Sequence, residues 1–338
     1  MEASTSVVYV EANRMSQRKR TVIDMLRESP GFVSGEAISR TLGISRNAVH
    51  KHVKSLRARG YRILGVSHRG YMLEEEPCRL IMGVIGELTE GSMFGRSFRY
   101  YDEIDSTNTE AKSLAIDGAP EGTVVIAECQ SAGRGRLGRR WTSPAGKGLL
   151  FSVVLRPELT LAEAHLLTVV TAVAACAGIE AQTHIPVQIK WPNDLYVDDK
   201  KVGGILLEIA GEQDEIDWVV AGIGINANTE FTELPVSLRR SATSLKMAGG
   251  VPVDRSELLA RVLLSLEQSY VDAVANGFDR SLREFRDRDF LLNKSVSVQT
   301  REGPVVGEAA GIDDHGALLV ELPHRHIRRF HSGDVTLH

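Results

Sequence analysis

The sequence predicts an α+β protein of several domains, with a helix-turn-helix head, a central α/β unit and a small all-β domain at the C-terminus. A chain of 338 residues is too long for one ordinary domain. Residues 1–73 carry 13 Lys/Arg against 5 Asp/Glu, whereas the remaining residues carry 27 against 39. After about residue 288 the apolar period falls to two residues, which is typical of strands. The predicted divisions are a loose tail (1–15), the head (16–76), the central domain (80–287) and the β domain (288–338).

The head has the spacing of a winged helix-turn-helix. Apolar positions predict a helix over residues 16–28, closed by the Ser-Pro-Gly run at 29–31. Ser34 then caps a short helix, Gly43 makes the turn, and Ser45 caps a longer helix that runs to about residue 59. Residues 61–64 and 70–73 are predicted strands, and the residues between them form a basic wing.

The longer helix of this motif presents hydrogen-bond donors on one face. Val49, Val53 and Leu56 fall at i, i+4 and i+7, so they face the core and leave the donors outside. Such donors suit phosphates and base edges. Together with the wing and the positive charge, they predict DNA binding through Ser45, Arg46, Asn47, His50, Lys51, Lys54 and Arg69. The alternative is a winged helix that serves only protein contacts.

The central region alternates helices with short apolar runs. Capping-box pairs predict helices that begin at Thr107 with Glu110, at Thr160 with Glu163 and at Asp254 with Glu257, and that end at Gly118, at Gly178 and near Gly277. Strands are predicted at 124–127, 149–155, 187–190, 195–197, 205–209 and 218–225. In the C-terminal domain they are predicted at 296–298, 305–308, 318–320 and 326–330.

Cysteine spacing and hydropathy indicate the compartment. Cys78, Cys129 and Cys176 are far apart, which predicts reduced thiols rather than a disulfide framework or a zinc site. The N-terminus has no Lys/Arg-led apolar run of signal-peptide length, and no later run approaches ~18 uninterrupted apolar residues. We therefore expect a cytoplasmic protein with no membrane partner.

The most unusual segment is a glycine–arginine loop at residues 130–141. Three glycines and four arginines within eight residues are incompatible with a stable helix or a buried strand. Glycine lets the backbone approach a ligand, and arginine offers planar donors to phosphate or carboxylate. A mobile solvated loop of the RNA-binding type is the alternative. The acidic, folded surroundings and the flanking Gln130 and Trp141 favour a small anionic ligand.

Two further segments accompany the loop. Lys190 ends a predicted strand that Pro192 terminates, in a Lys-Trp-Pro-Asn-Asp run at 190–194, where α/β sheets tend to place ligands. A Gly-Ile-Gly-Ile-Asn run at 222–226 follows another strand. Neither the Gly-Lys-Gly at 146–148 nor the Gly-x-Gly-x-x-Ala at 222–227 completes a phosphate-binding fingerprint, and no Gly-x-Ser-x-Gly elbow occurs.

Taken together, these segments resemble the biotin–protein ligase family, specifically its bifunctional bacterial members that also act as the biotin-operon repressor. The resemblance runs from about Arg18 to His338. It rests on the runs at 105–108, 130–141, 190–194, 201–205, 222–226 and 333–337. Leu137 is the departure in the loop, because some members carry a basic residue there.

The resemblance implies a fold and a reaction. The central domain is expected to have the mixed sheet of the biotin/lipoate ligase type, and the C-terminal domain to be a small SH3-like β-barrel. Biotin and ATP, the two substrates, give biotinyl-5′-AMP and pyrophosphate. Biotin then passes to one lysine of the biotin carboxyl carrier protein domain of a biotin-dependent carboxylase, as in a biotin–[acetyl-CoA-carboxylase] ligase.

The resemblance also implies residue roles. The catalytic residues are expected to be Lys190, Arg134 and Arg136. The residues expected to bind biotin are Ser106, Thr107, Asn108, Gln130, Arg134, Gly135, Arg136 and Lys190. Those expected to bind ATP and the adenylate are Arg136, Arg139, Lys190 and Asn226. Mg²⁺ is expected with ATP, with its ligands unknown; Asp194 is a weak candidate that alternatively braces its own turn.

The implied partners are operator DNA and a second copy of the chain in an adenylate-bound homodimer, with biotinyl-AMP as corepressor of biotin synthesis genes. A lipoate–protein ligase of related fold is disfavoured by the glycine–arginine loop and the attached head. A pure transcription factor that only senses biotin is disfavoured by the intact Lys190 and arginines. A ligase whose winged helix no longer binds an operator stays an open alternative.

Overall fold

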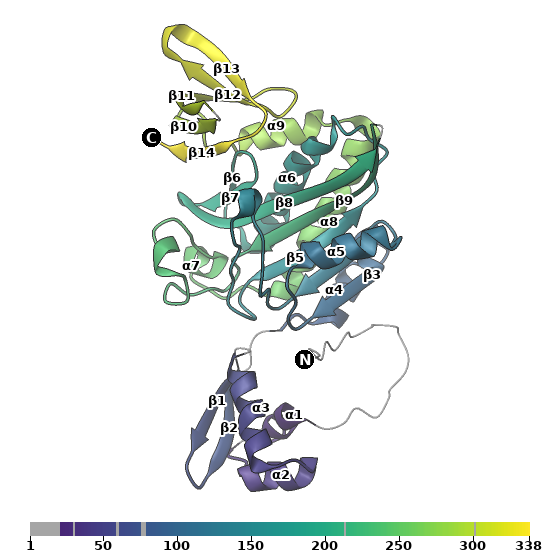
Figure 1. Cartoon of the computed structure of the whole chain (residues 1–338), viewed down its shortest axis with the longest axis vertical. Helices are drawn as coiled ribbons and strands as arrows, with labels where there is room; N and C mark the ends of the chain where they lie inside the picture. The colour runs from purple at the N-terminus through teal and green to yellow at the C-terminus, as the bar shows by residue number, and fades with distance from the viewer. Residues whose placement is uncertain (1–20, 30, 59–60, 76–78, 213, 301) are drawn as a thin grey trace.

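The computed structural model describes residues 21–29, 31–58, 61–75, 79–212, 214–300 and 302–338. These residues form the three predicted bodies, with the head at one end and the C-terminal β domain at the other (Figure 1). The predicted tail (1–15) and Cys78 lie outside the described residues. The last strand of the head ends at Glu75, and the first helix of the central domain begins at Met82.

The head is a winged helix-turn-helix. It consists of α1 (Val22–Arg27), α2 (Gly35–Leu42), α3 (Arg46–Ala58), β1 (Arg62–Val66) and β2 (Gly70–Glu75). Val49, Val53 and Leu56 are buried in its core, as the helical period predicts. Gly43 ends α2 in the left-handed region, at φ 65°, which glycine adopts without strain. The pairing of β1 with β2 continues to Val66 and Gly70, so the turn of the wing is shorter than predicted.

The first helix is observed only in part, because residues 16–20 lie outside the described residues. α1 begins after Thr21, whose hydroxyl and backbone N–H both donate to Asp24. This contact fixes the start of the described helix.

A seven-stranded mixed sheet forms the centre, as the resemblance implies. Its order is β3-β4-β5-β9-β8-β7-β6, and only the β3–β4 pair is parallel. The strands are β3 (Ser97–Tyr101), β4 (Thr123–Ala127), β5 (Leu149–Leu155), β6 (Gln188–Lys190), β7 (Asp194–Val197), β8 (Lys200–Glu212) and β9 (Glu215–Ile225). β3 was not predicted, since its Ser-Phe-Arg-Tyr-Tyr lacks an aliphatic run.

Helices cover both faces of this sheet. α6 (Leu167–Thr183) and α8 (Arg255–Asn276) pack on one face, where they build the main core. α5 (Thr107–Ile116) packs on the other face, with Ala111 and Ala115 against Val125 and Ala127. Shorter helices complete the domain: α4 (Met82–Leu88), η1 (Met93–Gly95), η2 (Arg136–Gly138), η3 (Ala164–Leu166), η4 (Val236–Leu238), α7 (Leu245–Gly249) and α9 (Asp279–Asp287). α5 is seen in front of the sheet, and α6 and α8 behind it (Figure 1).

Two predicted boundaries in this domain were wrong. α6 continues past Gly178 to Thr183, because this glycine serves close packing rather than termination. A Cβ atom at Gly178 would lie 2.6 Å from the Cα atom of Val262 on α8. The contact of Thr160 with Glu163 is present, but it opens a turn that leads into η3 before α6 begins.

The predicted capping box of α5 was also wrong. Ser106 occupies the N-cap position, and Glu110 accepts a hydrogen bond from the Tyr101 hydroxyl at 2.7 Å instead of turning back to the cap. The side chain of Thr107 is thereby left for other contacts. By contrast, Asp254 caps α8 as predicted, accepting from the backbone N–H groups of Ser256 and Glu257.

The C-terminal domain is a five-stranded antiparallel sheet with the order β13-β12-β11-β10-β14. Its strands are β10 (Ser295–Thr300), β11 (Gly303–Ile312), β12 (Leu318–Leu322), β13 (His326–Phe330) and β14 (Asp334–Leu337), with η5 (Pro323–Arg325) before β13. The Trp191 ring of the Lys-Trp-Pro-Asn-Asp run donates to the Gly316 carbonyl at 2.9 Å. The β domain therefore docks against the strand end that carries Lys190.

One helix is long and apolar enough to cross a membrane by length and composition. It covers Ala164–Thr183, and 72% of its most apolar window is buried inside the molecule. Figure 1 shows α6 behind the sheet and beside α8. It is the core helix of the central domain.

Candidate functional site

One pocket brings together several parts of the chain that are far apart in sequence. It opens where the start of α5, the glycine–arginine loop and the ends of β6 to β9 meet the C-terminal domain. The predicted binding residues that line it are Ser106, Thr107, Asn108, Gln130, Arg134, Gly135, Arg136, Arg139, Lys190 and Asn226. No predicted residue of the biotin or nucleotide site lies elsewhere.

The start of α5 forms a buried, interlocked wall of this pocket. Ser106, Thr107 and Asn108 are 2%, 3% and 4% exposed. Gln130 Oε1 accepts from the Thr107 backbone N–H at 2.7 Å, which satisfies one of the free donors at the helix start. The Ser152 hydroxyl on β5 lies 2.7 Å from Asn108 Oδ1 and 2.8 Å from Thr107 Oγ1. These contacts hold the side chains in one arrangement before any ligand is present.

A carboxylate that the sequence reading missed completes this wall. Glu208 on β8 accepts from the Asn108 amide at 2.9 Å and from Lys112 at 2.7 Å. Burial acts to raise the pKa of Glu208, but the hydrogen bonds from Lys112 and Asn108 outweigh it and hold the pKa below its ordinary value. Glu208 is therefore an anion that fixes the orientation of the Asn108 carboxamide. No spacing pattern along the chain could reveal its role, because Glu208 on β8 and Asn108 on α5 are 100 residues apart in sequence.

Gly222 on β9 lies so close to this wall that there is no room for a side chain. A Cβ atom there would lie 1.9 Å from Asn108 Oδ1, which is far inside van der Waals contact. Gly224, two residues later, faces the Trp141 ring, and a Cβ atom would lie 2.7 Å from Trp141 Cε2. The Gly-x-Gly spacing of β9 thus serves close packing against Asn108 and Trp141, and not a dinucleotide turn.

The glycine–arginine loop folds back on itself as a narrow turn. Trp141 N–H donates to the Gly133 carbonyl at 2.9 Å, and Gly135 N–H donates to the Arg139 carbonyl at 2.7 Å. Leu137, at the tip, is 75% exposed and has a φ of 55°. The loop is therefore ordered by only a few backbone hydrogen bonds, and its tip touches little of the protein.

The loop arginines differ in their contacts. Arg136 is half-buried and donates to Asn193 Oδ1 at 3.2 Å, and burial lowers its pKa. Arg139 is paired with Asp334 at the start of β14. Arg134 is exposed. Arg140 donates to the Ser131 carbonyl within the loop at 2.8 Å. Two of the four arginines are thus tied to the segments that flank the pocket, one to the Lys-Trp-Pro-Asn-Asp run and one to the C-terminal domain.

Lys190 sits at the end of β6, as predicted. Its ammonium lies 5.5 Å from the centre of the Tyr196 ring. Burial lowers the pKa of Lys190, in part offset by the negative charges of Asp194 and Asp334. Burial also raises the pKa of Tyr196 to about 12. Lys190 is therefore a partly desolvated cation directed at the pocket.

The remaining predicted polar residues have structural partners. Asn226 is 7% exposed and donates one amide hydrogen to the Thr243 carbonyl at 3.0 Å. Asp194 accepts from Lys201 at 2.6 Å. Among the described residues no group of three or more His, Cys, Asp or Glu side chains is placed to hold a metal ion. The side chain of Asp194 on β7 is thus paired with Lys201 on β8.

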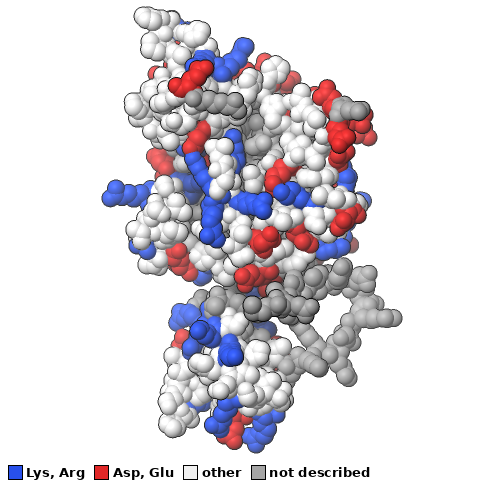
Figure 2. All heavy atoms as spheres, viewed as in Figure 1, with Lys and Arg blue, Asp and Glu red and all other residues white. Residues whose placement is uncertain are grey.

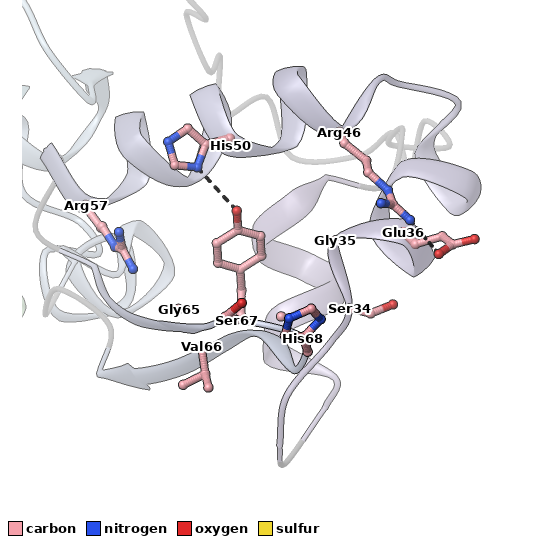
Figure 3. Close-up of a pocket in the computed structure, with 12 residues that line it drawn as sticks. Ser34, Gly35, Glu36, Arg46, His50, Arg57, Gly65, Val66, Ser67 and His68 are labelled. Carbon is pink, nitrogen blue, oxygen red and sulfur yellow. Dashed lines mark hydrogen bonds and ion pairs between the residues drawn. The ribbon is translucent and has the colours of Figure 1, made fainter.

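The head carries a second hollow, between α3 and the wing (Figure 3). His50 Nδ1 lies 3.3 Å from the Tyr71 hydroxyl across it, and Arg46 pairs with Glu36 at 2.6 Å. His68, at the wing tip, also lines the hollow and was not among the predicted DNA-binding residues. Figure 2 shows Lys and Arg side chains over the head as well as over the middle of the central domain.

The predicted DNA-binding set is exposed on one face of the head, with two qualifications. Ser45, Arg46, Asn47, His50, Lys51, Lys54 and Arg69 are all exposed. The Ser45 hydroxyl is engaged as a helix cap, accepting from Ala48 N–H at 3.1 Å. The Arg69 guanidinium stacks over the Phe32 ring, 4.3 Å from its centre. Ser45 and Arg69 are therefore held by the head itself, as are Arg46 and His50 through the contacts given above, whereas Asn47, Lys51 and Lys54 are exposed on α3.

Comparisons with known proteins agree with this division of the chain. The biotin/lipoate A/B protein ligase family matches residues 100–226, an HTH domain matches residues 18–72, and the biotin protein ligase C terminal domain matches residues 291–337. The bifunctional ligase/repressor BirA of Bacillus spizizenii is 38% identical over 323 residues, which are 95% of this chain and 99% of that protein. The protein of the same name from Bacillus subtilis is 37% identical over the same shares.

Solved structures are similar as well. The biotin protein ligase of Aquifex aeolicus in complex with biotin and ATP has a TM-score of 0.62 and 30% identity. It covers 72% of this chain and 99% of that chain.

Proposed function

The chain belongs to the biotin–protein ligase family, in the branch that carries a helix-turn-helix domain. From this premise we propose which residues bind biotin, which bind the nucleotide and which drive the reaction. It is an ATP-dependent biotin–[biotin carboxyl carrier protein] ligase and a biotinyl-AMP-dependent repressor of biotin synthesis genes. The single observation that carries the assignment of roles is the meeting of a buried amide and hydroxyl wall with Lys190 and the loop arginines in one pocket.

The buried wall binds the uncharged head of biotin. Its side chains offer directed donors and acceptors at fixed positions, because Ser152, Gln130 and Glu208 already hold them. An uncharged ligand gains affinity from such preorganised hydrogen bonds, since their ordering cost is met during folding. Ser106, Thr107, Asn108 and Gln130 take this role.

Lys190 and the arginines drive the adenylation step. A biotin carboxylate oxygen attacks the α-phosphorus of ATP, the bond to the β-phosphate oxygen breaks, and pyrophosphate leaves with the electron pair. Two anionic groups approach each other, so positive charge at the reacting centre lowers the barrier. Lys190 and Arg136 supply it at the carboxylate and α-phosphate, Arg139 and Asn226 contact the nucleotide, and Arg134 lies beside biotin.

The loop covers the adenylate after it forms. The backbone of Gly135 and its neighbours is free to close over the mixed anhydride, which excludes water from a bond that water would cleave. In the second step the amine of the acceptor lysine attacks the biotinyl carbon. The carbon–oxygen bond to AMP then breaks, and the amine loses a proton.

In this proposal Mg²⁺ binds together with ATP, and no protein ligand is assigned to it. Asp194, the candidate ligand, is engaged by Lys201, and the described residues form no carboxylate cluster at the pocket. No step above depends on a protein–metal contact.

The head gives the repressor activity. Helix-turn-helix proteins read two half-sites as dimers, so we propose that an adenylate-bound homodimer binds the operator through the exposed face of α3 and the wing. The acceptor is a biotin carboxyl carrier protein domain, and the protein works in the cytoplasm with no membrane partner. An operator shift assay with the upstream region of the organism's biotin genes, with and without biotin and ATP, tests this half: no biotin-dependent shift would remove it.

Adenylate accumulation tests the ligase site. Purified protein is incubated with biotin and ATP, and biotinyl-AMP is quantified for the parent, Lys190→Ala and Arg136→Ala. Both variants are expected to lose accumulation, and rates like those of the parent in both would contradict the residue assignment. A parallel incubation with lipoate distinguishes the related lipoate ligase activity, which we expect to be absent.

A further inference from the structure

An ion pair lies directly behind the biotin wall, and neither of its members lines the pocket. Lys112 on α5 donates to Glu208 Oε1 on β8 at 2.7 Å, and the two side chains are each 26% exposed. The pocket-lining residues include Asn108, one helical turn before Lys112, but neither Lys112 nor Glu208. The pair is therefore placed to act on a ligand only through the residues in front of it.

The carboxamide of Asn108 directs both of its N–H donors away from the neighbouring hydroxyl groups. Asn108 Nδ2 lies 2.9 Å from Glu208 Oε2 and 3.2 Å from the Leu206 carbonyl, so both amide hydrogens have an acceptor. A hydrogen bond to an ionised carboxylate is roughly twice as strong as one between neutral groups, so Glu208 is the stronger of the two acceptors. With its nitrogen held there, the amide turns Oδ1 toward Ser152. The charge of Glu208 thus settles which end of the amide the wall presents.

The orientation of this amide sets the direction of the hydroxyl groups beside it. The Ser152 hydroxyl has one proton and lies near two oxygens, Asn108 Oδ1 at 2.7 Å and Thr107 Oγ1 at 2.8 Å. Asn108 Oδ1 can only accept, so it takes this proton. The Thr107 proton also stays inside the wall, because Gln130 Oε1 accepts it at 3.1 Å. The oxygens of Thr107 and Asn108, two pocket-lining residues, therefore offer lone pairs rather than protons to a ligand.

A wall of lone pairs fits a ligand that donates hydrogen bonds. The head of biotin is a cyclic urea with N–H groups, whereas the dithiolane ring of lipoate has none. A site built to accept from N–H groups rejects an analogue that lacks them, because its buried acceptors then stay unpaired. The direction of the hydrogen bonds in the wall therefore favours biotin over lipoate.

Glu208 keeps its charge because of the groups that face it. Burial acts to raise the pKa of Glu208, but the hydrogen bonds from Lys112 and Asn108 and the charges of Lys112 and Arg134 outweigh it. Lys112 belongs to α5, and Arg134 belongs to the glycine–arginine loop. Without Lys112, this half-buried carboxylate would take up a proton at a higher pH. A protonated carboxyl group carries a donor of its own and holds the Asn108 amide less firmly.

We propose that Lys112 and Glu208 are positioning residues for biotin binding, which hold an anion behind Asn108 so that the biotin wall presents acceptors to the N–H groups of the urea. Neither residue touches the ligand. The inference rests on the proposed function of the pocket, and it adds the residues that set its preference for a donating ligand.

The first test is the affinity of the full chain for biotinamide, measured by calorimetry without ATP between about pH 5 and pH 8. This probe keeps the urea but has no carboxylate of its own that would titrate. Lys112→Met is expected to bind within about twofold of the parent at about pH 8, and about fivefold more weakly at about pH 5, where Glu208 becomes protonated in the variant. Binding at the higher pH also shows that the variant is folded.

Two further variants control for charge and for the substitution itself. Lys112→Arg keeps the positive charge beside Glu208 and is expected to follow the parent at both pH values. Lys294→Met removes a lysine that pairs with Asp199 at 3.5 Å outside the pocket, and it should also follow the parent. Equal affinities of Lys112→Met and the parent at about pH 5 would overturn the proposal. An equal loss at both pH values would overturn it as well, because Lys112 would then act by packing alone.

The second test removes the titrating group. Glu208→Gln has no charge to lose at position 208, so its affinity for biotinamide is expected to be the same at both pH values. In that background Lys112→Met should change the affinity by less than about twofold, because its effect acts through the carboxylate. A fivefold loss at about pH 5 in this background would show that Lys112 acts by another path and would contradict the role of Glu208.

The third test separates binding from reaction. At about pH 5, Lys112→Met is expected to raise the KM for biotin by about fivefold and to leave kcat for adenylation within about twofold of the parent. A loss in kcat with an unchanged KM would contradict a positioning role in biotin binding. If the parent binds neither biotin nor biotinamide, the proposed function of the pocket fails. If the parent binds both and Lys112→Met follows it at every pH, only the roles of Lys112 and Glu208 fail.

Discussion

The two walls of the pocket are built in opposite ways. The biotin wall at the start of α5 consists of buried side chains such as Thr107 and Asn108, which are hydrogen-bonded to the half-buried Gln130 and Glu208. The opposite wall is a loop of exposed or half-buried cations, held by a few backbone hydrogen bonds and two side-chain contacts. An uncharged ligand is best recognised by fixed hydrogen bonds, whereas phosphate charge that moves during reaction is best met by cations on an adaptable segment. The difference separates binding from chemistry, and each prediction below acts on one wall.

The largest effect on biotin binding is expected from Gly222→Ala, which acts on the rigid wall. The new Cβ atom would lie 1.9 Å from Asn108 Oδ1, so the carboxamide must leave its place between Ser152 and Glu208. Overpacking of this kind costs about 1–3 kcal/mol, and we expect the KM for biotin to rise by at least about tenfold. Steady-state adenylation over a range of biotin concentrations measures it. Gly83→Ala, in α4 with open space around the added methyl, is the control; equal KM values in the two variants would contradict the packing argument.

Lys190→Ala acts on the charged wall and is expected to affect rate rather than affinity. Loss of one preorganised electrostatic group typically lowers kcat by about 10²–10³-fold. Biotin affinity should change by less than about threefold, because the buried wall keeps its hydrogen bonds. Single-turnover adenylation and biotin calorimetry separate the two quantities. A large loss of biotin affinity with an unchanged rate would reverse the roles given to the two walls.

The pH dependence of adenylation tests whether Lys190 acts through its positive charge. Burial lowers the pKa of Lys190, so its ammonium loses the proton at a lower pH than an exposed lysine does. The rate is therefore expected to fall as pH rises toward that lowered pKa. Lys190→Arg keeps its charge at all accessible pH values and should move this alkaline fall to higher pH. Coincident profiles for the parent and Lys190→Arg would show that another group controls the fall.

Breaking the contact between the loop and the C-terminal domain should have a smaller effect. Arg139 and Asp334 are paired, but their side chains are 62% and 31% exposed, so the pair is screened by water. Exposed ion pairs contribute about 0–1 kcal/mol, and Asp334→Asn is expected to change the KM for ATP by less than about fivefold. Kinetics at low and high salt check this, because a screened pair matters less at high salt. A change of about a hundredfold would mean that Asp334 acts directly on the nucleotide.

The smallest effect is expected at the tip of the loop. Leu137 is 75% exposed. Leu137→Lys is expected to leave the adenylation rate and the biotin KM within about twofold of the parent, as for surface substitutions away from specific contacts. A marked gain in rate would instead place the tip against the nucleotide phosphates.

The sequence was sufficient for those features that have local causes. The helix-turn-helix follows from caps and apolar spacing, and the strand end at Lys190 follows from Pro192. The glycine–arginine loop was visible because its composition excludes helix and strand. The features that could not be predicted from the sequence depend on contacts between distant segments. Glu208 lies 100 residues from the amide that it orients, and no spacing along the chain reveals it.

The errors of the sequence reading have the same origin. Gly178 was taken as a helix end, but it lies inside α6, where the backbone of α8 approaches too closely for a side chain. Thr107 and Glu110 have the spacing of a capping box. In the folded protein, however, the Thr107 hydroxyl donates to Gln130, and the Glu110 carboxylate accepts from the Tyr101 hydroxyl. Tertiary contacts thus override a local signal at the positions where the site is assembled.

The separation of binding from chemistry is tested most directly by a single-turnover experiment on Lys190→Ala. The variant is saturated with biotin, as verified by calorimetry, then mixed with ATP, and biotinyl-AMP is quantified over time. We predict biotin affinity within about threefold of the parent and adenylate formation slower by about 10²-fold or more. Adenylate formation at the rate of the parent would contradict the account, because the cations of the pocket would then not be what drives the reaction.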